Sequence, residues 1–135
     1  MKTTYPPQVY QIALTYLPDV GPVKGRKLAS FYPHLSDIFR LAAYSQAATE
    51  VLDEAYKTYL ICEEDQVEIL YFQNSGYPQR LKHLYDSPLV LFKKGPVDLN
   101  SHRLVAVVGT RHASDLGKKV TVDLVRSEER RVGKE

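Results

Sequence analysis

The sequence predicts an α+α/β protein, in which a helical domain of residues 1–65 precedes the start of an α/β domain in residues 66–125. Two observations support this fold class. Apolar residues recur at helical spacing as far as about residue 61, and short β-prone runs follow the acidic cluster at residues 63–65. The change in periodicity therefore places a domain boundary near residue 65.

Four helices are expected in the first domain, because apolar side chains recur there at i, i+3, i+4 and i+7. The expected helices are Gln8–Tyr16, Val23–Phe31, Leu35–Ala43 and Thr49–Ile61. The single cysteine, Cys62, follows the last of them and cannot form an internal disulfide, which indicates a reducing compartment. We expect it to be a small buried apolar residue at the end of that helix.

Three β-prone runs follow, with one or two helical turns expected at Gln79–Tyr85. The runs are Val67–Phe72, Leu89–Lys93 and Leu104–Val108. The last is continuously apolar, which is typical of a strand buried on both faces of a parallel sheet. It is the strongest strand signal in the chain.

The loop after this run is the best candidate binding site in the sequence. Ser114 and Asp115 are helix-start residues, so the loop connects the carboxyl end of a strand to the amino end of a helix, where α/β proteins bind phosphate. The loop fits neither G-x-G-x-x-G nor the Walker pattern. Arg111 can hold a phosphate through two parallel hydrogen bonds, but it can also pair with a carboxylate, leaving Ser114 as a helix cap only.

Leu14–Leu28 predicts two helices joined by a tight Pro/Gly hairpin, which resembles helix-hairpin-helix and sterile-alpha-motif-like domains. In the DNA-binding form of this hairpin, glycines allow the backbone to approach a phosphate. Asp19 stands where the first of these glycines would be, and its carboxylate would repel a phosphate. The sequence therefore favours a helical packing or partner-docking module.

Composition and charge exclude several classes of protein. The chain has 135 residues and a net charge of +2, which permits a nucleic-acid partner without requiring one. No secretory pattern or membrane-length apolar run is present, so we expect a cytoplasmic protein. The four histidines lack ligand spacing, and no residue has the neighbours of a nucleophile, so neither a metal site nor a catalytic residue is expected.

Three segments occur in a characteristic order and spacing: Tyr77–Pro78–Gln79–Arg80–Leu81, then Asp86–Ser87–Pro88–Leu89–Val90–Leu91 with Lys94–Gly95, then Val105–Ala106–Val107–Val108–Gly109–Thr110–Arg111 with Ser114 and Gly117. Together they resemble the opening of the extended Rossmann domain of the DNA-processing protein A family, also called DprA or Smf. The hairpin at residues 17–22 resembles the helical N-terminal domain of that family.

The resemblance implies a protein without enzymatic activity or cofactor, which binds single-stranded DNA and loads the recombinase RecA in natural transformation. It implies a homodimer for the full-length protein. The residues implied to bind the DNA backbone are Gly109, Thr110, Arg111 and Ser114. An alternative from another class is a Rossmann-like nucleotide-binding enzyme, such as a nucleotide phosphoribohydrolase, that uses the same loop for a ribose phosphate.

The last ten residues, Arg126–Glu135, resemble the translation of a common sequencing adapter. We therefore expect residues 126–135 to be a non-native tail, and the chain to be an N-terminal fragment in which the Rossmann-like domain is incomplete. The other interpretation of this segment is a charged helix end with Gly133 as its C-cap.

Overall fold

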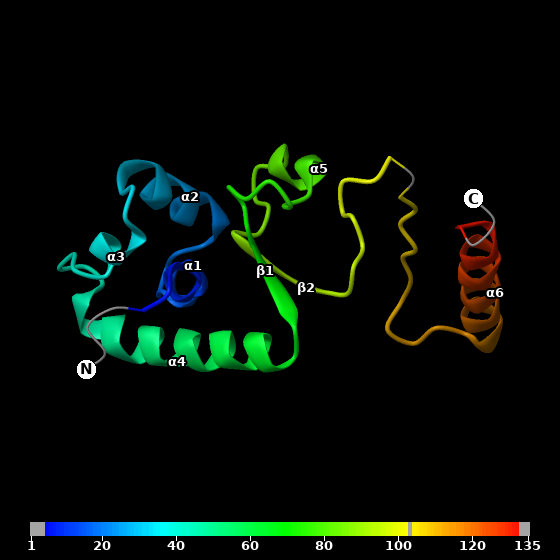
Figure 1. The fold of residues 1–135 in the computed structure, drawn as a ribbon, viewed down its shortest axis with the longest axis horizontal. Helices are drawn as coiled ribbons and strands as arrows, with labels where there is room; N and C mark the ends of the chain where they lie inside the picture. Colours follow the sequence, from blue (N-terminus) through cyan, green and yellow to red (C-terminus); the bar gives the residue numbers. More distant parts are fainter. Residues whose placement is uncertain (1–4, 103, 133–135) are drawn as a thin grey trace. The chain divides into compact units, whose positions relative to one another are not determined.

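The computed structural model describes residues 5–102 and 104–132, except for the side chains of residues 127–132. The chain divides into two compact units, Met1–Ser101 and His102–Glu135, which we describe separately and call the first and second units. Helices and strands follow one another in the order α1 to α4, β1, α5, β2 and α6 (Figure 1). None of the helices described is long and apolar enough to cross a membrane.

The helical part of the first unit contains α1 (Pro7–Tyr16), α2 (Pro22–Phe31), α3 (Leu35–Ile38) and α4 (Ser45–Glu64). Proline opens both α1 and α2, where its fixed φ suits the first helical position and its missing N–H costs no hydrogen bond. Helix α1 packs against the other three helices. In Figure 1 it is seen end-on, between α2 above and α4 below.

All four expected helices are present, but the third is shorter than Leu35–Ala43. After Ile38 the chain continues in turns that are closed by hydrogen bonds between residues three positions apart. These bonds run from Arg40 N to Asp37 O (3.1 Å) and from Tyr44 N to Leu41 O (2.9 Å). These turns bring Phe39 and Tyr44 into the core together with Ile38. Tertiary packing therefore replaces the helix that local periodicity predicts.

Strands β1 (Val67–Tyr71) and β2 (Val90–Lys94) form an antiparallel pair in which Ile69 lies opposite Phe92. Both strands agree with the predicted runs to within one residue at each end. The connection between them contains the short helix α5 (Gln79–Lys82), as expected for residues 79–85.

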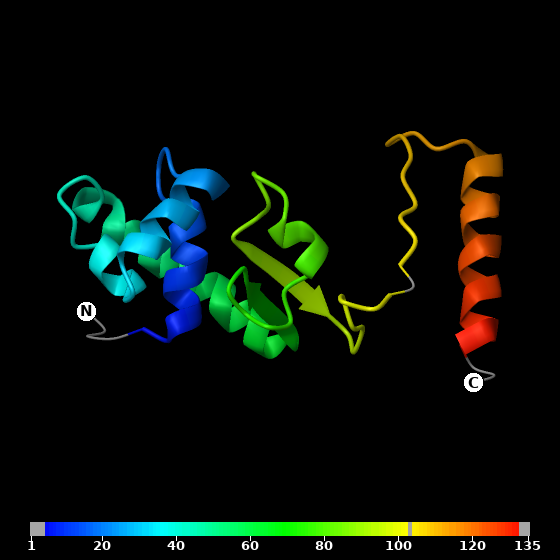
Figure 2. The same ribbon diagram turned by 90° about the horizontal axis from the view of Figure 1, so that it is seen from above.

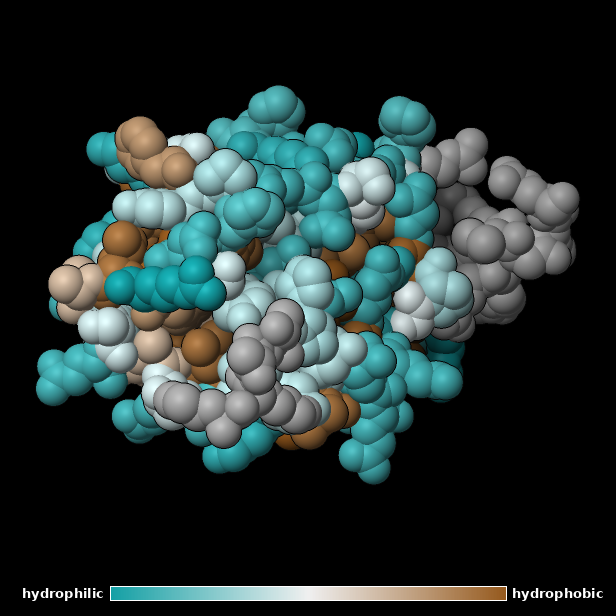
Figure 3. Space-filling view, turned by 60° about the vertical axis from the view of Figure 1, so that its left-hand side comes forward, coloured by the Kyte–Doolittle hydropathy of each residue, from teal (hydrophilic) through white to brown (hydrophobic). Residues whose placement is uncertain are grey.

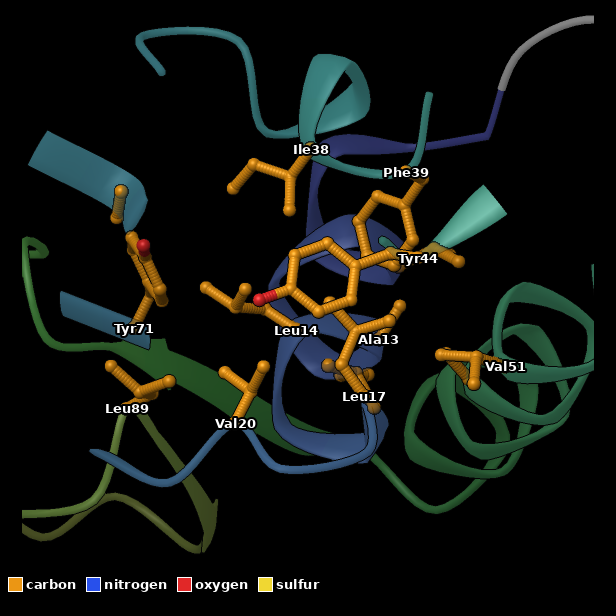
Figure 4. Packing of buried hydrophobic residues seen from close by; sticks show 14 residues of the cluster. Ala13, Leu14, Leu17, Val20, Ile38, Phe39, Tyr44, Val51, Tyr71 and Leu89 are labelled. Carbon is orange, nitrogen blue, oxygen red and sulfur yellow. The ribbon is translucent and has the colours of Figure 1, made fainter. Parts of the chain in front are cut away.

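One hydrophobic core joins the helices to the sheet. Figure 4 shows Tyr71 and Leu89, from the strand-containing part, in the same cluster as Leu14 and Leu17 of the helical part. Hydrophilic side chains cover most of the face drawn in Figure 3, with apolar side chains visible between them. Residues on both sides of the expected boundary near residue 65 thus share one core, and the boundary itself stays a prediction.

The expected strand at Leu104–Val108 is wrong for this structure. These residues have no strand partner in the described chain, and their side chains are exposed, with Val108 at 91%. A strand needs a neighbour to pair with its N–H and C=O groups, and the only described pair, β1 with β2, is antiparallel. An apolar run predicts burial, but neighbouring elements must supply it. The second unit therefore consists of extended chain followed by α6 (Asp115–Val132), as Figure 2 shows.

The hairpin between α1 and α2 turns at Asp19, where φ is +58°. This left-handed conformation favours glycine, and among other residues aspartate tolerates it well. The backbone thus agrees with the sequence-based alignment that puts Asp19 where related hairpins have glycine.

Alanine at position 19 should test this conformation. Asp19→Ala is expected to unfold about 1 kcal/mol more easily than Asp19→Gly, because alanine pays the steric cost of a positive φ. Urea unfolding followed by circular dichroism measures the difference. Equal stability of the two variants would show that position 19 does not adopt the left-handed conformation.

A side chain at position 25 should destabilise the protein. A Cβ at this position would overlap Leu89 Cδ1, and Leu89 is itself only 3% exposed. Overpacking a core costs about 1–3 kcal/mol, and the gain in helix propensity from glycine to alanine offsets about 1 kcal/mol of this. We expect Gly25→Ala to lower the free energy of unfolding by about 1 kcal/mol. Gly21→Ser, at an open N-cap position, is the control and should leave stability unchanged or slightly higher.

Candidate functional site

The loop that the sequence selects leads directly into α6. Ser114 Oγ accepts a hydrogen bond from Gly117 N (3.2 Å), and Ser114 O accepts one from Lys118 N (3.0 Å). Ser114 therefore caps the helix, because its side chain satisfies one of the N–H groups that the first turn leaves without a partner. Its hydroxyl proton stays available for a second acceptor, so capping and phosphate binding are compatible.

Arg111 lies exposed in the same loop. It has no hydrogen bond or ion pair with any residue that the structure describes. Of the two roles that the sequence left open for this guanidinium, pairing with a carboxylate is thus not observed among the described side chains of the second unit. A planar cation with five free N–H donors is suited to a phosphate oxygen pair.

The other two predicted residues complete the loop. Thr110 Oγ1 donates to the carbonyl of His112 (3.0 Å), which holds the turn between Arg111 and the helix. A Cβ added to Gly109 would meet nothing within 4 Å, so packing among the described residues does not require glycine there. Open space beside a glycine allows the close approach of an external group to the backbone.

The charge at this helix start is mixed. The dipole and the N–H groups of the first turn of α6 favour an anion. Asp115, however, adds a fully exposed carboxylate, which pairs with Lys118 at 3.5 Å. Because that lysine offsets the carboxylate, Arg111 supplies the excess positive charge of the loop.

Comparisons with known proteins agree with this region. Residues 68–131 match the family model of DNA recombination-mediator protein A, which includes the whole loop. The DNA processing protein DprA of Bacillus subtilis is 32% identical over 101 residues, which cover 74% of this chain and 27% of that protein. This chain belongs to the DNA-processing protein A family.

A second DprA, from Streptococcus pneumoniae, is 49% identical over 43 residues, or 32% of this chain and 15% of that protein. The chain therefore spans about a quarter or less of the length of these relatives. No solved structure matches it. The family match reaches into residues 126–135, and the non-native origin expected for that segment stays a prediction.

The other DprA-like segments serve packing. Tyr77 is fully buried, and its hydroxyl donates to Pro88 O at 2.6 Å. The chain beside it is held by Asn100, whose Oδ1 accepts from Gln79 N at 2.8 Å. These contacts fold the connection between β1 and β2 onto the sheet, which explains why the first two motif segments occur together.

Arg26 is the residue that sequence reasoning missed. From α2 its guanidinium donates to Leu84 O (3.3 Å) and to Ser87 O (3.3 Å) and Oγ, and it lies 5.3 Å from the centre of the Phe72 ring. Its partners lie about 60 positions further along the chain. No local pattern could have identified them.

A cavity of about 920 Å³ opens in the first unit. The residues that line it are Tyr5, Pro7, Tyr10, Gln11, Ala29, Ser30, Pro33, His34, Leu35, Ser36, Tyr71, Gln73 and Asn74. Tyr71 is 3% exposed, and its hydroxyl has no hydrogen-bond partner among the residues that the structure describes. Burial raises the pKa of its phenol to about 12. Among the described residues, no lysine, arginine or carboxylate lines the cavity, so these residues offer no fixed positive charge to a phosphate.

Cys62 and the histidines add no chemistry to the described chain. Cys62 is buried at the end of α4, as predicted, and burial raises the pKa of its thiol, which disfavours the reactive thiolate. Among the described residues, no group of His, Cys, Asp or Glu is arranged to hold a metal ion.

Removing the Tyr71 hydroxyl should stabilise the protein. A buried hydroxyl without a partner costs about 1–3 kcal/mol, so Tyr71→Phe is expected to raise the free energy of unfolding by about 1 kcal/mol. The wild type should also lose stability between pH 10 and pH 12, because the unfolded phenol ionises near 10 and the folded one only near 12. Tyr71→Phe should lose less over this range.

Urea unfolding across a pH series measures both effects. Tyr85→Phe is the control, since Tyr85 is 79% exposed, and should match the wild type. A Tyr71→Phe protein that is less stable than the wild type at neutral pH would contradict the unpartnered state of the hydroxyl.

Proposed function

We propose that the DprA-family protein containing this chain binds single-stranded DNA through the Gly109–Ser114 loop and acts in DNA recombination. The observation that supports this most is the exposed Arg111 guanidinium, which has no partner among the described residues and lies within the family match. Loading of RecA, a role in natural transformation and a homodimer are proposed for the whole protein on the family relationship.

The loop offers two side-chain donors and an open approach to a sugar–phosphate backbone. Arg111 can engage two oxygens of one phosphate, and the Ser114 hydroxyl can donate to an oxygen while it accepts from Gly117 N. Gly109 permits close approach of the backbone. Such contacts hold a strand without reading its bases, which suits a protein that must bind DNA of any sequence.

We propose a binding role without catalysis. The family match does not favour a nucleotide phosphoribohydrolase, the alternative from the enzyme class. A phosphate held by Arg111 and a capped helix start needs no nucleophile, and the described hydrogen bonds of Thr110 and Ser114 go to backbone groups and not to the His112 imidazole.

Arg111→Ala in the full-length protein is expected to weaken binding of single-stranded DNA and to flatten its salt dependence. Losing one phosphate contact should reduce the slope of log K against log salt by about 0.7 for a single strand. Arg111→Lys should fall between alanine and wild type, because lysine keeps the charge but not the two-pronged geometry. Fluorescence anisotropy with a labelled oligothymidylate in a salt series measures both quantities.

Arg40→Ala is the matched control, because Arg40 is exposed and paired only with Asp37 among the ion pairs described. It should bind DNA as the wild type does. Unchanged affinity and slope in Arg111→Ala would remove the loop from the binding site.

A further inference from the structure

Charge is divided between two sides of the first unit. Helix α2 and residues 79–87 together contain five cations and one carboxylate, whereas α4 contains five carboxylates and one cation. The cations of the first group are Lys24, Arg26, Lys27, Arg80 and Lys82, and its carboxylate is Asp86. The carboxylates of α4 are Glu50, Asp53, Glu54, Glu63 and Glu64, and its cation is Lys57. We call the first group the α2–α5 surface.

Helices α2 and α4 lie on opposite sides of α1, and α5 lies near β1 on the same side as α2 (Figure 1). Packed helices have axes about 8–10 Å apart, so α2 and α4 are separated by roughly 16–20 Å across α1. The Debye length at physiological salt is about 8 Å. The carboxylates of α4 therefore do little to cancel the field of the cations on the other side.

Arg26 connects the two parts of the α2–α5 surface, because its guanidinium binds α2 to Leu84 and Ser87. Lys27 projects into solvent from α2, whereas the ammonium group of Lys24 lies 5.7 Å from the centre of the Tyr44 ring. Lys82 donates to Asn74 O at 3.2 Å, with further donors remaining on its ammonium group. The two carboxylates nearest in sequence, Asp19 and Asp86, are exposed and flank α2 and α5 rather than separating their cations.

Exposed aromatic rings accompany these cations. Phe31, at the end of α2, is 70% exposed, and Tyr85, after α5, is 79% exposed. Cations accompanied by exposed rings suit a single-stranded nucleic acid, because phosphates pair with the cations and unstacked bases stack on the rings. An acidic protein segment would use the cations but would leave the rings without planar partners.

We propose that the α2–α5 surface is a second contact for single-stranded nucleic acid, additional to the Gly109–Ser114 loop. The inference rests on the proposed function, since it assumes that the whole protein binds single strands. It assigns to the helical part a direct share in binding, beyond the packing or docking role that the hairpin sequence favours. The hairpin carboxylate of Asp19 does not oppose it, because the strand would contact the exposed side of α2 and residues 79–87.

The test compares two substitutions that change the net charge equally. Lys27→Glu places a carboxylate on the α2–α5 surface, and Lys57→Glu places one on α4, where Lys57 is exposed and contacts only Glu54 among the ion pairs described. In the full-length protein, Lys27→Glu is expected to raise the Kd for a long oligothymidylate about 3- to 10-fold at low salt and to flatten the salt slope. Lys57→Glu should change the Kd less than about 2-fold, since screening weakens its effect.

Tyr85→Ala gives an independent signature. It should weaken binding while leaving the salt slope unchanged, because stacking releases no counterions. Tyr85→Phe keeps the ring and should restore affinity. Thermal unfolding by circular dichroism should be alike for all these variants, since each side chain is exposed.

The outcomes separate this inference from the proposed function. If the wild type fails to bind oligothymidylate, the proposed function is wrong and this inference is wrong with it. If Arg111→Ala weakens binding while Lys27→Glu and Lys57→Glu behave alike, only the second surface is overturned. If Lys27→Glu leaves DNA binding intact but abolishes binding of polyglutamate, the surface recognises an acidic protein, which also overturns the inference.

Discussion

The packing of the first unit depends on the guanidinium of Arg26, which is the polar group that joins α2 to the chain before β2. It meets the carbonyls of Leu84 and Ser87 while lying against the Phe72 ring, so one side chain satisfies polar groups and covers an aromatic face. The preceding residue, Gly25, leaves room for Leu89. Gly25, which has no side chain, and Arg26, which has a long one, thus help to determine where the strand-containing part packs on the helices.

This arrangement explains which parts of the fold the sequence could predict. Helices α1, α2 and α4 follow from local periodicity, because each buries one side against the same core. Strands β1 and β2 follow from runs of β-prone residues. The end of α3 could not be predicted, since burial of Phe39 and Tyr44 replaces helical hydrogen bonds with turns. The run at Leu104–Val108 has the composition of a buried strand, but pairing is a property of two strands and cannot be derived from one.

The candidate site shows the same division between local and distant effects. The capping role of Ser114 could be predicted, because its partner Gly117 is three residues away. That Arg111 has no partner among the described residues could not be predicted, because any carboxylate in the chain could have paired with it. The family relationship was evident from the order of short motifs, although the buried contacts of Tyr77 and Ser87 show that two of those segments are concerned with packing.

The net charge of +2 gave no guidance about a partner, and the structure explains why. A sum over the chain treats the carboxylates of α4 and the cations of α2 as cancelling, but electrostatic interactions in salt solution act over about one Debye length. Because α1 separates the two groups, a polyanion approaching α2 meets mainly positive charge (Figure 1). A protein whose positive and negative charges nearly balance can therefore present one mainly positive and one mainly negative side. The fold determines which charges lie close enough to act together.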